Sequence, residues 1–336
     1  MKLLNKTQIW DVYSMEDALV DTAEAFKAVS NDKTISPLRT RMNLDDSRTV
    51  LVMPCFSDEV DAVAVKTIGL YPGNASRGLA TAPATTIVLD ADTGELQAVL
   101  DGDTVTKIRT GASSGVAFRA LAVAGAHIGV VVGTGGQAFT QVLAMVASVP
   151  SLEELRIVNP DEQQLERFIE TLDSWKPWKE FGFEGVVRGY SSSDDAAKDA
   201  DVIILVTSST EPVLSAHNLK PGVTISCVGS YQPHMQECGA DIIERADKIY
   251  CDHVESALEE SGDLIIPIND GGITRDDIAG DIGHVLDGTI PGRDNDDQII
   301  VYETVGVGAQ DLWAASAIVA AAEKAGIGTD IPALNT

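Results

Sequence analysis

The chain of 336 residues has no run of about 18 apolar residues, the length that spans a membrane as a helix. Its first residues, Met-Lys-Leu-Leu-Asn-Lys-Thr, lack the apolar core of a secretory signal. Positive charge is scarce as well, because 24 lysines and arginines stand against 51 aspartates and glutamates, a net charge of −27. So many carboxylates repel phosphate groups, and we expect neither nucleic acid nor a membrane as a partner. The sequence leaves open whether this acidity reflects a salt-rich cytoplasm.

Cysteine is also scarce and lacks the spacing of a metal site or a disulfide framework. The four cysteines, Cys55, Cys227, Cys238 and Cys251, form no Cys-x-x-Cys pair, and the five histidines form no His-x-x-x-His pair. The pattern predicts reduced thiols, a cytoplasmic location and no metal site. A hydrophobic content of 44% and a charged content of 22% are typical of a globular protein, which excludes a disordered or fibrous chain.

The N-terminal third has the pattern of a mixed α/β unit. Residues 14–30 carry apolar side chains at helical spacing, among them Leu19 and Phe26. Residues 86–101 are typical of an antiparallel hairpin with Asp-Thr-Gly at its turn. Residues 103–122 are rich in Ala, Gly and Ser and predict a helix with Asp103 as its N-cap. Other strand-like runs are residues 49–55 and 60–70.

From about residue 126 the pattern becomes an alternation of strands and helices. An apolar strand at 127–132 precedes a helix at 135–148, and the order repeats at 155–159 and 162–172. Such alternation predicts a doubly wound parallel sheet of the Rossmann type, so the fold class is α/β. Further strands are expected at 186–190, 202–207, 223–228 and 248–251, and an alanine-rich helix at 307–325.

A glycine-rich loop lies between the first strand and the first helix of this alternation. Gly133, Gly135 and Ala138 match the pattern G-x-G-x-x-A. The first glycine permits a tight turn, the second lets a pyrophosphate approach the backbone, and Ala138 lets the helix pack closely on the strand. A plain strand-to-helix turn is the alternative. The flanking strand and helix favour a dinucleotide cofactor, NAD(H) or NADP(H).

The residue after the second strand of such a domain contacts the adenosine ribose. In this chain that residue is Asn159, whose amide can bond either a 2′-hydroxyl or a 2′-phosphate oxygen. No arginine follows, and Asp161 would repel a phosphate. The choice between NAD and NADP therefore stays open, and Asn159 is equally typical of a cap for the following helix.

Three cationic residues near glycine-rich segments are candidates for binding an anionic substrate. Lys66 lies inside the apolar run Ala62–Leu70, on the same face as Ala62 and Ala64. A lysine in such a run is costly to bury without a partner, so it lies either on an exposed face or in a carboxylate or imine site. Arg39 and Arg109 suit a bidentate grip on a carboxylate, although an ordinary surface ion pair is the alternative for each.

The order of these motifs resembles the ornithine cyclodeaminase/mu-crystallin family, which also contains archaeal alanine dehydrogenases and reductases of cyclic imino acids. The resemblance extends over nearly the whole chain. It rests on Pro37-Leu38-Arg39, Val65-Lys66-Thr67, Tyr71-Pro72-Gly73-Asn74, Gly78-Leu79-Ala80-Thr81, residues 92–95, 100–102 and 108–111, the glycine loop, and residues 228–233, 283–286, 291–293 and 301–306.

This resemblance implies a homodimer with a substrate-binding and dimerisation domain made of residues 1–122 and 307–336. An NAD(P)-binding Rossmann-type domain, residues 123–306, is inserted into it. The resemblance implies that Arg39 and Lys66 hold the substrate α-carboxylate, that Lys66 lies at the reacting carbon and that Arg109 helps to line the site. The implied cofactor-binding residues are Thr81, Arg109, Thr110, Gly133, Gly135, Gly136, Gln137, Asn159, Thr207, Val228, Ser230 and Thr304.

Two positions depart from the family pattern. In cyclodeaminases and archaeal alanine dehydrogenases, an aspartate stands two residues before the proline of a late loop, where this chain has Tyr231. A phenol is a poor general base near neutral pH, so we expect Tyr231 to orient the substrate. Glu303 stands where many members have lysine. Glu237 and Asp241 are nearby acids that are candidates to replace the absent carboxylate.

These features favour an NAD(P)H-dependent reductase of a small α-imino acid, such as pyrroline-2-carboxylate or piperideine-2-carboxylate. Reducing a C=N bond asks less of a general base than expelling ammonia does. An ornithine cyclodeaminase with recycled NAD, an enzyme of the alanine dehydrogenase type, and a non-catalytic binder of a small ligand are the alternatives. The sequence does not identify which imino or amino acid is bound.

Overall fold

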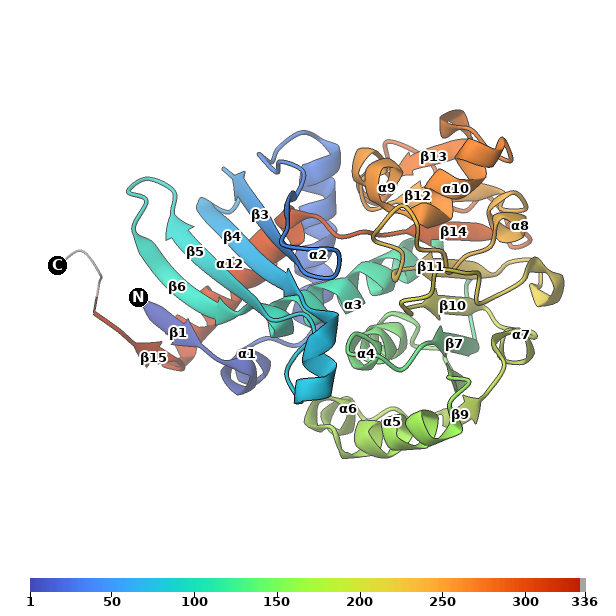
Figure 1. Cartoon of the computed structure of the whole chain (residues 1–336), viewed down its shortest axis with the longest axis horizontal. Coiled ribbons are helices and arrows are strands. Elements are labelled where there is room, and N and C mark those ends of the chain that lie inside the picture. Colours follow the sequence, from blue (N-terminus) through green and yellow to red (C-terminus); the bar gives the residue numbers. More distant parts are fainter. Residues whose placement is uncertain (333–336) are drawn as a thin grey trace. The chain divides into compact units, whose positions relative to one another are not determined.

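The computed structural model describes residues 1–332, which form two compact units (Figure 1). The first unit contains residues 1–109 and the described residues from 307 onward, and the second contains residues 110–306. Helix α3 (Gly102–Leu121) begins in the first unit and ends in the second. The predicted α/β class is confirmed, since each unit combines a sheet with helices.

The first unit is built on a seven-stranded sheet in the order β15-β1-β6-β5-β4-β3-β2. Strands β2 to β6 pair antiparallel with their sequence neighbours, and β5 and β6 form the predicted hairpin. The strands are β1 (Lys2–Leu4), β2 (Thr40–Asn43), β3 (Thr49–Ser57), β4 (Ala62–Leu70), β5 (Ala84–Asp90), β6 (Leu96–Asp101) and β15 (Thr329–Asp330).

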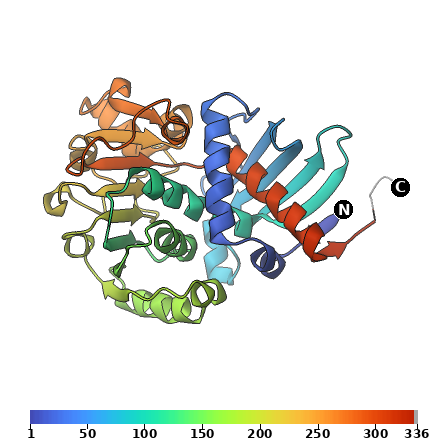
Figure 2. The same ribbon diagram turned by 180° about the vertical axis from the view of Figure 1, so that it is seen from behind.

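Helix α12 (Gly308–Ala325) packs against this sheet over β3, β4 and β5, and α2 (Met15–Ser30) packs against α12 (Figure 2). Helix α2 begins as the sequence predicts, because the Ser14 side chain caps it by accepting a hydrogen bond from the Asp17 backbone N–H. Its face with Leu19 and Phe26 is buried. The remaining helices of this unit are α1 (Lys6–Val12) and the short 3₁₀ helix η1 (Pro72–Arg77).

The predicted N-cap of α3 is wrong. The helix begins at Gly102, and the Asp101 carboxylate accepts a hydrogen bond of 2.8 Å from the Thr104 backbone N–H. Asp103 lies inside the first turn, where it forms an ion pair of 2.6 Å with Lys107. A β-carbon at Gly102 would lie 2.7 Å from the backbone nitrogen of Thr85, so the helix start can lie against β5 only because this residue is glycine.

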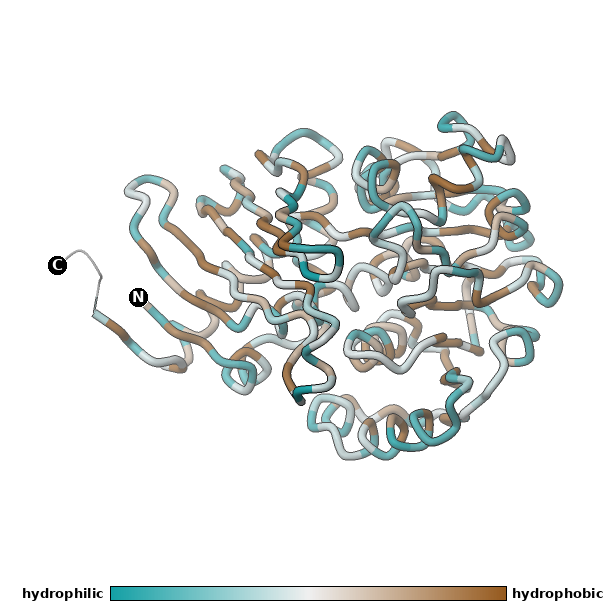
Figure 3. Tube along the Cα trace, viewed as in Figure 1, coloured by the Kyte–Doolittle hydropathy of each residue, from teal (hydrophilic) through white to brown (hydrophobic). Residues whose placement is uncertain are grey.

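The second unit contains the predicted parallel sheet, with eight strands in the order β13-β12-β14-β11-β10-β7-β8-β9. The strands are β7 (Ile128–Val132), β8 (Glu154–Val158), β9 (Val186–Tyr190), β10 (Val202–Leu205), β11 (Thr224–Cys227), β12 (Lys248–Cys251), β13 (Ile278–Asp281) and β14 (Ile300–Glu303). Its central strands are hydrophobic and fully buried, as in a doubly wound core (Figure 3).

The chain reverses direction across this sheet between β7 and β10, which are neighbours. In open α/β sheets, ligands bind beyond the carboxyl ends of the strands at such a point. The helices and 3₁₀ turns of the unit are α4 (Ala138–Ser148), α5 (Glu162–Ser174), α6 (Lys176–Phe181), α7 (Ser193–Ala196), η2 (Ala216–Asn218), α8 (Ala240–Ile243), α9 (Val254–Glu260), α10 (Gly262–Asp270), η3 (Arg275–Asp277) and α11 (Ile282–Leu286).

All four cysteines are buried and free, in agreement with the prediction of reduced thiols. Among residues 1–332, no helix combines the length and the apolar character that a membrane crossing requires.

Candidate functional site

Lys66 lies in the middle of β4 and is 1% exposed. The alternation of the strand puts it on the same buried face as Ala62 and Ala64. The alternative of a solvated lysine is therefore excluded. A lysine this deeply buried requires a charged partner, because desolvation of an unpaired ammonium group is costly.

That partner is Asp311 in α12, which the sequence reasoning missed. Nζ of Lys66 lies 2.7 Å from Oδ2 of Asp311, and both side chains are 1% exposed. Nε of Arg109 lies 3.5 Å from Oδ1 of the same carboxylate. Gln310 accepts a hydrogen bond from Nη1 of Arg109 at 3.3 Å and donates one to its backbone carbonyl at 3.2 Å. These contacts fix the two cations around one acid within the first unit.

The pKa of Lys66 is lowered to about 7. Burial is the largest cause, the nearby charge of Arg109 lowers it further, Asp311 opposes the shift, and Arg39 adds a smaller lowering effect. The charges of Arg109 and Arg39, the other two predicted substrate-binding residues, thus act on Lys66. A lysine with a pKa near neutrality can both give and take a proton at physiological pH, as a general acid or base must.

The glycine loop of the second unit has the geometry of a dinucleotide-binding turn. Gly133 has φ +112°, and a β-carbon there would lie 2.6 Å from the carbonyl oxygen of Val206 after β10. A β-carbon at Gly135 would meet nothing within 4 Å, and Gly135 and Gly136 are exposed. The loop follows β7, at the point where the sheet reverses, so its open backbone suits a pyrophosphate ahead of α4.

Asn159 follows β8 and connects the glycine loop with the segment that precedes α5. Its Nδ2 donates a hydrogen bond of 2.5 Å to the hydroxyl of Thr134 in the glycine loop, and its Oδ1 accepts one of 2.8 Å from the Asp161 backbone N–H. The N-cap of α5 is Asp161, whose side chain accepts from the Gln164 backbone N–H. The alternative that Asn159 caps this helix is therefore wrong.

The other predicted cofactor residues differ in exposure. Ser230 and Thr304 are buried, with their hydroxyls bonded to the carbonyl of Met235 at 2.9 Å and to Asp252 at 2.7 Å. Their side chains therefore serve the interior of the second unit. In the second unit, Thr110 is buried, and three further residues are partly exposed: Gln137, Thr207 and Val228. Thr81, in the first unit, is exposed.

The two acids that were candidates to replace the absent aspartate are engaged in holding loops. Glu237 is fully buried and accepts hydrogen bonds from the backbone N–H groups of Thr207 and Gly229. Burial raises its pKa to about 8. Asp241 accepts a hydrogen bond of 2.8 Å from the Ala216 backbone N–H. Tyr231 is partly buried in the same unit, on the loop after β11.

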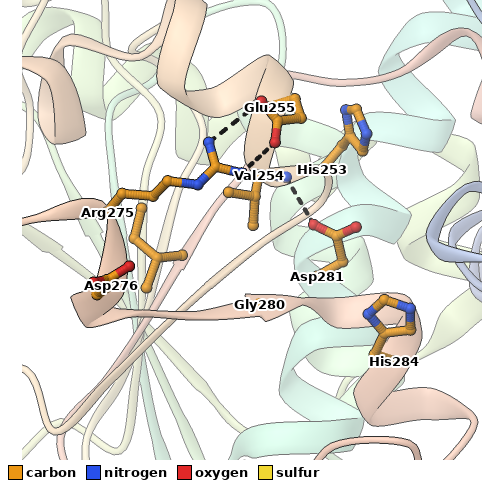
Figure 4. Close-up of a pocket in the computed structure, with 9 residues that line it drawn as sticks. His253, Val254, Glu255, Arg275, Asp276, Gly280, Asp281 and His284 are labelled. Atoms are coloured by element: carbon orange, nitrogen blue, oxygen red, sulfur yellow. Dashed lines mark hydrogen bonds and ion pairs between the residues drawn. The ribbon is translucent and has the colours of Figure 1, made fainter.

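The second unit has a pocket whose lining includes none of the predicted site residues (Figure 4). It is lined by residues of η3, α9, β13 and α11, including His253 and His284. Arg275 forms an ion pair with Glu255, and Asp281 accepts a hydrogen bond of 2.7 Å from the backbone N–H of Val254.

The chain is similar to known proteins over nearly its whole length. The sequence profile of the ornithine cyclodeaminase/mu-crystallin family matches residues 2–326. A Delta(1)-pyrroline-2-carboxylate reductase of Bacillus cereus is 31% identical over 332 residues, covering 98% of this chain and 99% of that one. The ketimine reductase mu-crystallin of Mus musculus is 29% identical over 320 residues, covering 94% and 95%.

A solved structure is similarly close. The Delta(1)-pyrroline-2-carboxylate reductase of Thermococcus litoralis, in complex with NADH and L-proline, matches with a TM-score of 0.91 at 30% identity. The match covers 98% of this chain and 100% of that chain.

Substituting Gly135 by alanine tests the role of the loop. Because the added methyl group has open space, Gly135→Ala is expected to unfold at the same temperature as the parent protein. The methyl group would occupy the space through which a pyrophosphate approaches, so the Kd for NADH is expected to rise by about tenfold or more, measured by fluorescence titration. Gly133→Ala is the contrasting variant, since its φ and the contact with Val206 predict a loss of stability. Unchanged NADH affinity in Gly135→Ala would show that the loop does not bind the cofactor.

Proposed function

Because the chain belongs to the ornithine cyclodeaminase/mu-crystallin family, as its motifs predicted, we propose that it is an NADH-dependent reductase of cyclic α-imino acids. Pyrroline-2-carboxylate and piperideine-2-carboxylate are the substrates that we favour, with proline and pipecolate as products. The observation that carries this proposal is the buried Lys66, whose pKa is lowered to about 7 beside two arginines and one aspartate. The names of the Bacillus and Thermococcus relatives support the same reaction.

In this proposal, each residue of the cationic group has a distinct task. Arg39 and Arg109 bind the substrate carboxylate, because a guanidinium offers paired donors that match its two oxygens. Reduced nicotinamide supplies the hydride that adds to the α-carbon. Lys66 gives a proton to the nitrogen of the former C=N bond, and Asp311 keeps the lysine oriented toward it. Tyr231 orients the substrate through its hydroxyl.

We propose NADH rather than NADPH as the preferred reductant. The chain after β8 carries Asn159 and then the acids Asp161 and Glu162, which repel a 2′-phosphate. Arg156, on β8 itself, is committed to Glu154 at 3.0 Å and to two backbone carbonyls. The Thermococcus relative contains NADH.

An absorbance assay at 340 nm tests the proposed reaction, with purified protein, NADH or NADPH, and each cyclic imine in turn. Steady oxidation of NADH with pyrroline-2-carboxylate or piperideine-2-carboxylate is the expected result, and NADPH is expected to be slower. Pyruvate with ammonia tests the alanine dehydrogenase alternative. Formation of proline and ammonia from ornithine without a net change in absorbance would establish a cyclodeaminase instead. No reaction with any substrate, while NADH still binds, would favour a non-catalytic binder.

The pH dependence of kcat tests Lys66. Because protonated Lys66 gives a proton during reduction, kcat for reduction is expected to fall as the pH rises through about 7, and kcat for proline oxidation to rise there. In Lys66→Ala, turnover is expected to fall by about 100-fold or more, with the NADH affinity unchanged. The negative charge of Asp311 raises the pKa of Lys66, so its removal lowers that pKa. In Asp311→Asn, the inflection in kcat is therefore expected at lower pH.

Lys107→Ala is the matched control for these variants. Lys107 lies on α3 and pairs with Asp103, with 32% of its side chain exposed. This variant is expected to keep the parent pH profile. If Lys66→Ala retained most of its turnover, the assignment of the proton to Lys66 would be wrong.

We also propose that the enzyme is a cytoplasmic homodimer whose interface includes the edge strand β2. This strand exposes Met42, and Leu38 and Leu44 beside it are exposed as well, with exposed fractions of 44% to 51%. An edge strand that lies among exposed apolar side chains is prone to pair with another chain. The free thiols are consistent with a reducing compartment.

Light scattering during size-exclusion chromatography tests the dimer. The parent protein is expected at twice the chain mass of 35.5 kDa, and the double variant Met42→Glu/Leu44→Glu at the single mass. Phe181→Glu is the control, since Phe181 of the second unit is similarly exposed at 43% and is expected to leave the dimer intact. A monomeric parent protein, or a dimeric double variant, would remove β2 from the proposed interface.

A further inference from the structure

The second unit buries a group of acidic and thiol side chains that the proposed reaction does not use. Cys227 ends β11 and Glu303 ends β14, and these two residues are opposite each other in the parallel pairing of the strands. Asp263 lies in the first turn of α10. All three residues are 0% exposed. Sγ of Cys227 and one oxygen from each carboxyl group lie within 4.8 Å of one another. We call these three residues the Cys227 cluster.

Each carboxyl group of this cluster has one oxygen that is bonded and one that is not. Oδ1 of Asp263 accepts hydrogen bonds of 2.7 Å and 3.1 Å from the backbone N–H groups of Glu237 and Cys238. One oxygen of Glu303 accepts a hydrogen bond of 2.9 Å from the hydroxyl of Ser261. The other two oxygens, Oδ2 of Asp263 and Oε2 of Glu303, are buried without a hydrogen-bond partner.

No positive charge compensates these groups within the described part of the chain. The largest influences on the carboxyl of Glu303 are burial, the acids Asp263 and Glu237, the thiol of Cys238 and the hydroxyl of Ser261, and no lysine or arginine is among these. Burying carboxylates without a counter-charge is costly, so a cation or protons must balance them. Sγ of Cys227 and one oxygen of each carboxyl group are close enough together to act as ligands of one small cation.

We propose that the Cys227 cluster binds one divalent transition-metal ion of the zinc type. Zinc accepts thiolate and carboxylate ligands in the same tetrahedral site, whereas magnesium and calcium avoid sulfur and require more oxygen ligands. The thiol of Cys238 is hydrogen-bonded to that of Cys227 but does not belong to the group of ligand atoms that lie within 4.8 Å of one another. On binding, the ion exchanges its water ligands for Sγ of Cys227 and one oxygen of each carboxylate, and the thiol and the proton-bearing carboxyl group release their protons to solvent.

Such an ion would hold together the loops that carry the predicted cofactor residues. Asp263 accepts from the backbone of Glu237, and the Glu237 carboxylate in turn accepts from the backbone N–H groups of Thr207 and Gly229. The three ligand residues are fully buried, which is typical of a structural metal site rather than a catalytic one. The Cys227 cluster therefore lies at the ends of β11 and β14 and is connected through Glu237 to the loop after β10.

The competing arrangement is a proton shared between the two free oxygens. Burial raises the pKa of Asp263 to about 7, so a carboxyl group that keeps its proton is chemically reasonable in the absence of a metal. The shared proton satisfies both oxygens but leaves the sulfur without a role. Metal content separates the two arrangements, whether or not the proposed reductase activity is found.

The first experiment measures metal in the full chain, produced in zinc-supplemented medium and purified without a chelator or a metal-affinity column. Inductively coupled plasma mass spectrometry is expected to find about one zinc ion per chain. Protein refolded with Co²⁺ in place of zinc is expected to show the intense visible bands of tetrahedral, thiolate-bound cobalt. Zinc well below one ion per chain together with a cobalt spectrum lacking those bands would overturn the proposal in favour of the shared proton.

Variants distinguish this site from adventitious binding. Cys227→Ser and Glu303→Gln are expected to lose the metal and the cobalt bands, whereas Cys55→Ser, which changes a buried free thiol of the first unit, is expected to keep both. Glu303→Lys addresses the risk of misfolding, because an ammonium group there supplies the missing positive charge. It is expected to fold cooperatively, with parent-like circular dichroism, and to contain no metal. Metal content that is equal in the parent, Cys227→Ser and Glu303→Lys would identify an adventitious ion only and would overturn the proposal.

Discussion

The buried ion pair between Lys66 and Asp311 sets the charge balance of the first unit. One carboxylate lies among three cations, since Arg109 contacts Asp311 and Arg39 is near enough to lower the pKa of Lys66. Burial is the largest cause of the lowered pKa of Lys66, the charges of Arg109 and Arg39 lower it further, and Asp311 opposes them. A small substrate with one carboxylate adds a second negative charge to this group. Carboxylate binding and proton transfer therefore depend on one arrangement of charges.

This arrangement requires the start of α12 to lie close to the sheet. Gly308, the first residue of α12, has no side chain, and a β-carbon there would lie 3.2 Å from the carbonyl oxygen of Pro54 and 3.3 Å from Cβ of Cys55. Both neighbours belong to β3, the strand that pairs with β4. The close approach of helix and sheet is what lets Asp311, one turn further along the helix, reach Lys66. A larger residue at position 308 would separate the acid from the base without touching either.

Signals that repeat within a short stretch of chain predicted much of this structure. The alternation of β4 put Lys66 on a face with small apolar residues, and the strand–helix alternation predicted the parallel sheet and its glycine loop. Asp311 could not be found in this way, because its partner lies at the other end of the chain and an acid in a first helical turn is common. The Cys227 cluster was hidden for the same reason, since its members come from two strands and a helix. Asp103 was a wrong choice of cap because two aspartates flank the start of α3, and only the contact of Gly102 with β5 decides between them.

Most buried carboxylates described in the second unit accept hydrogen bonds from backbone N–H groups, and Asp263 and Glu303 differ because each has one oxygen without a partner. Asp201 accepts two backbone N–H groups at the start of β7, and Asp252 accepts those of the residue after it and of Gly306. Glu237 bonds two loops at the ends of β10 and β11. In these acids both oxygens find hydrogen or ionic partners, which offsets the cost of burial. Asp263 and Glu303 each leave one oxygen without such a partner, and one oxygen of each lies within 4.8 Å of the thiol of Cys227. In the proposed site, a cation is the partner that these two carboxyl groups and the sulfur atom share.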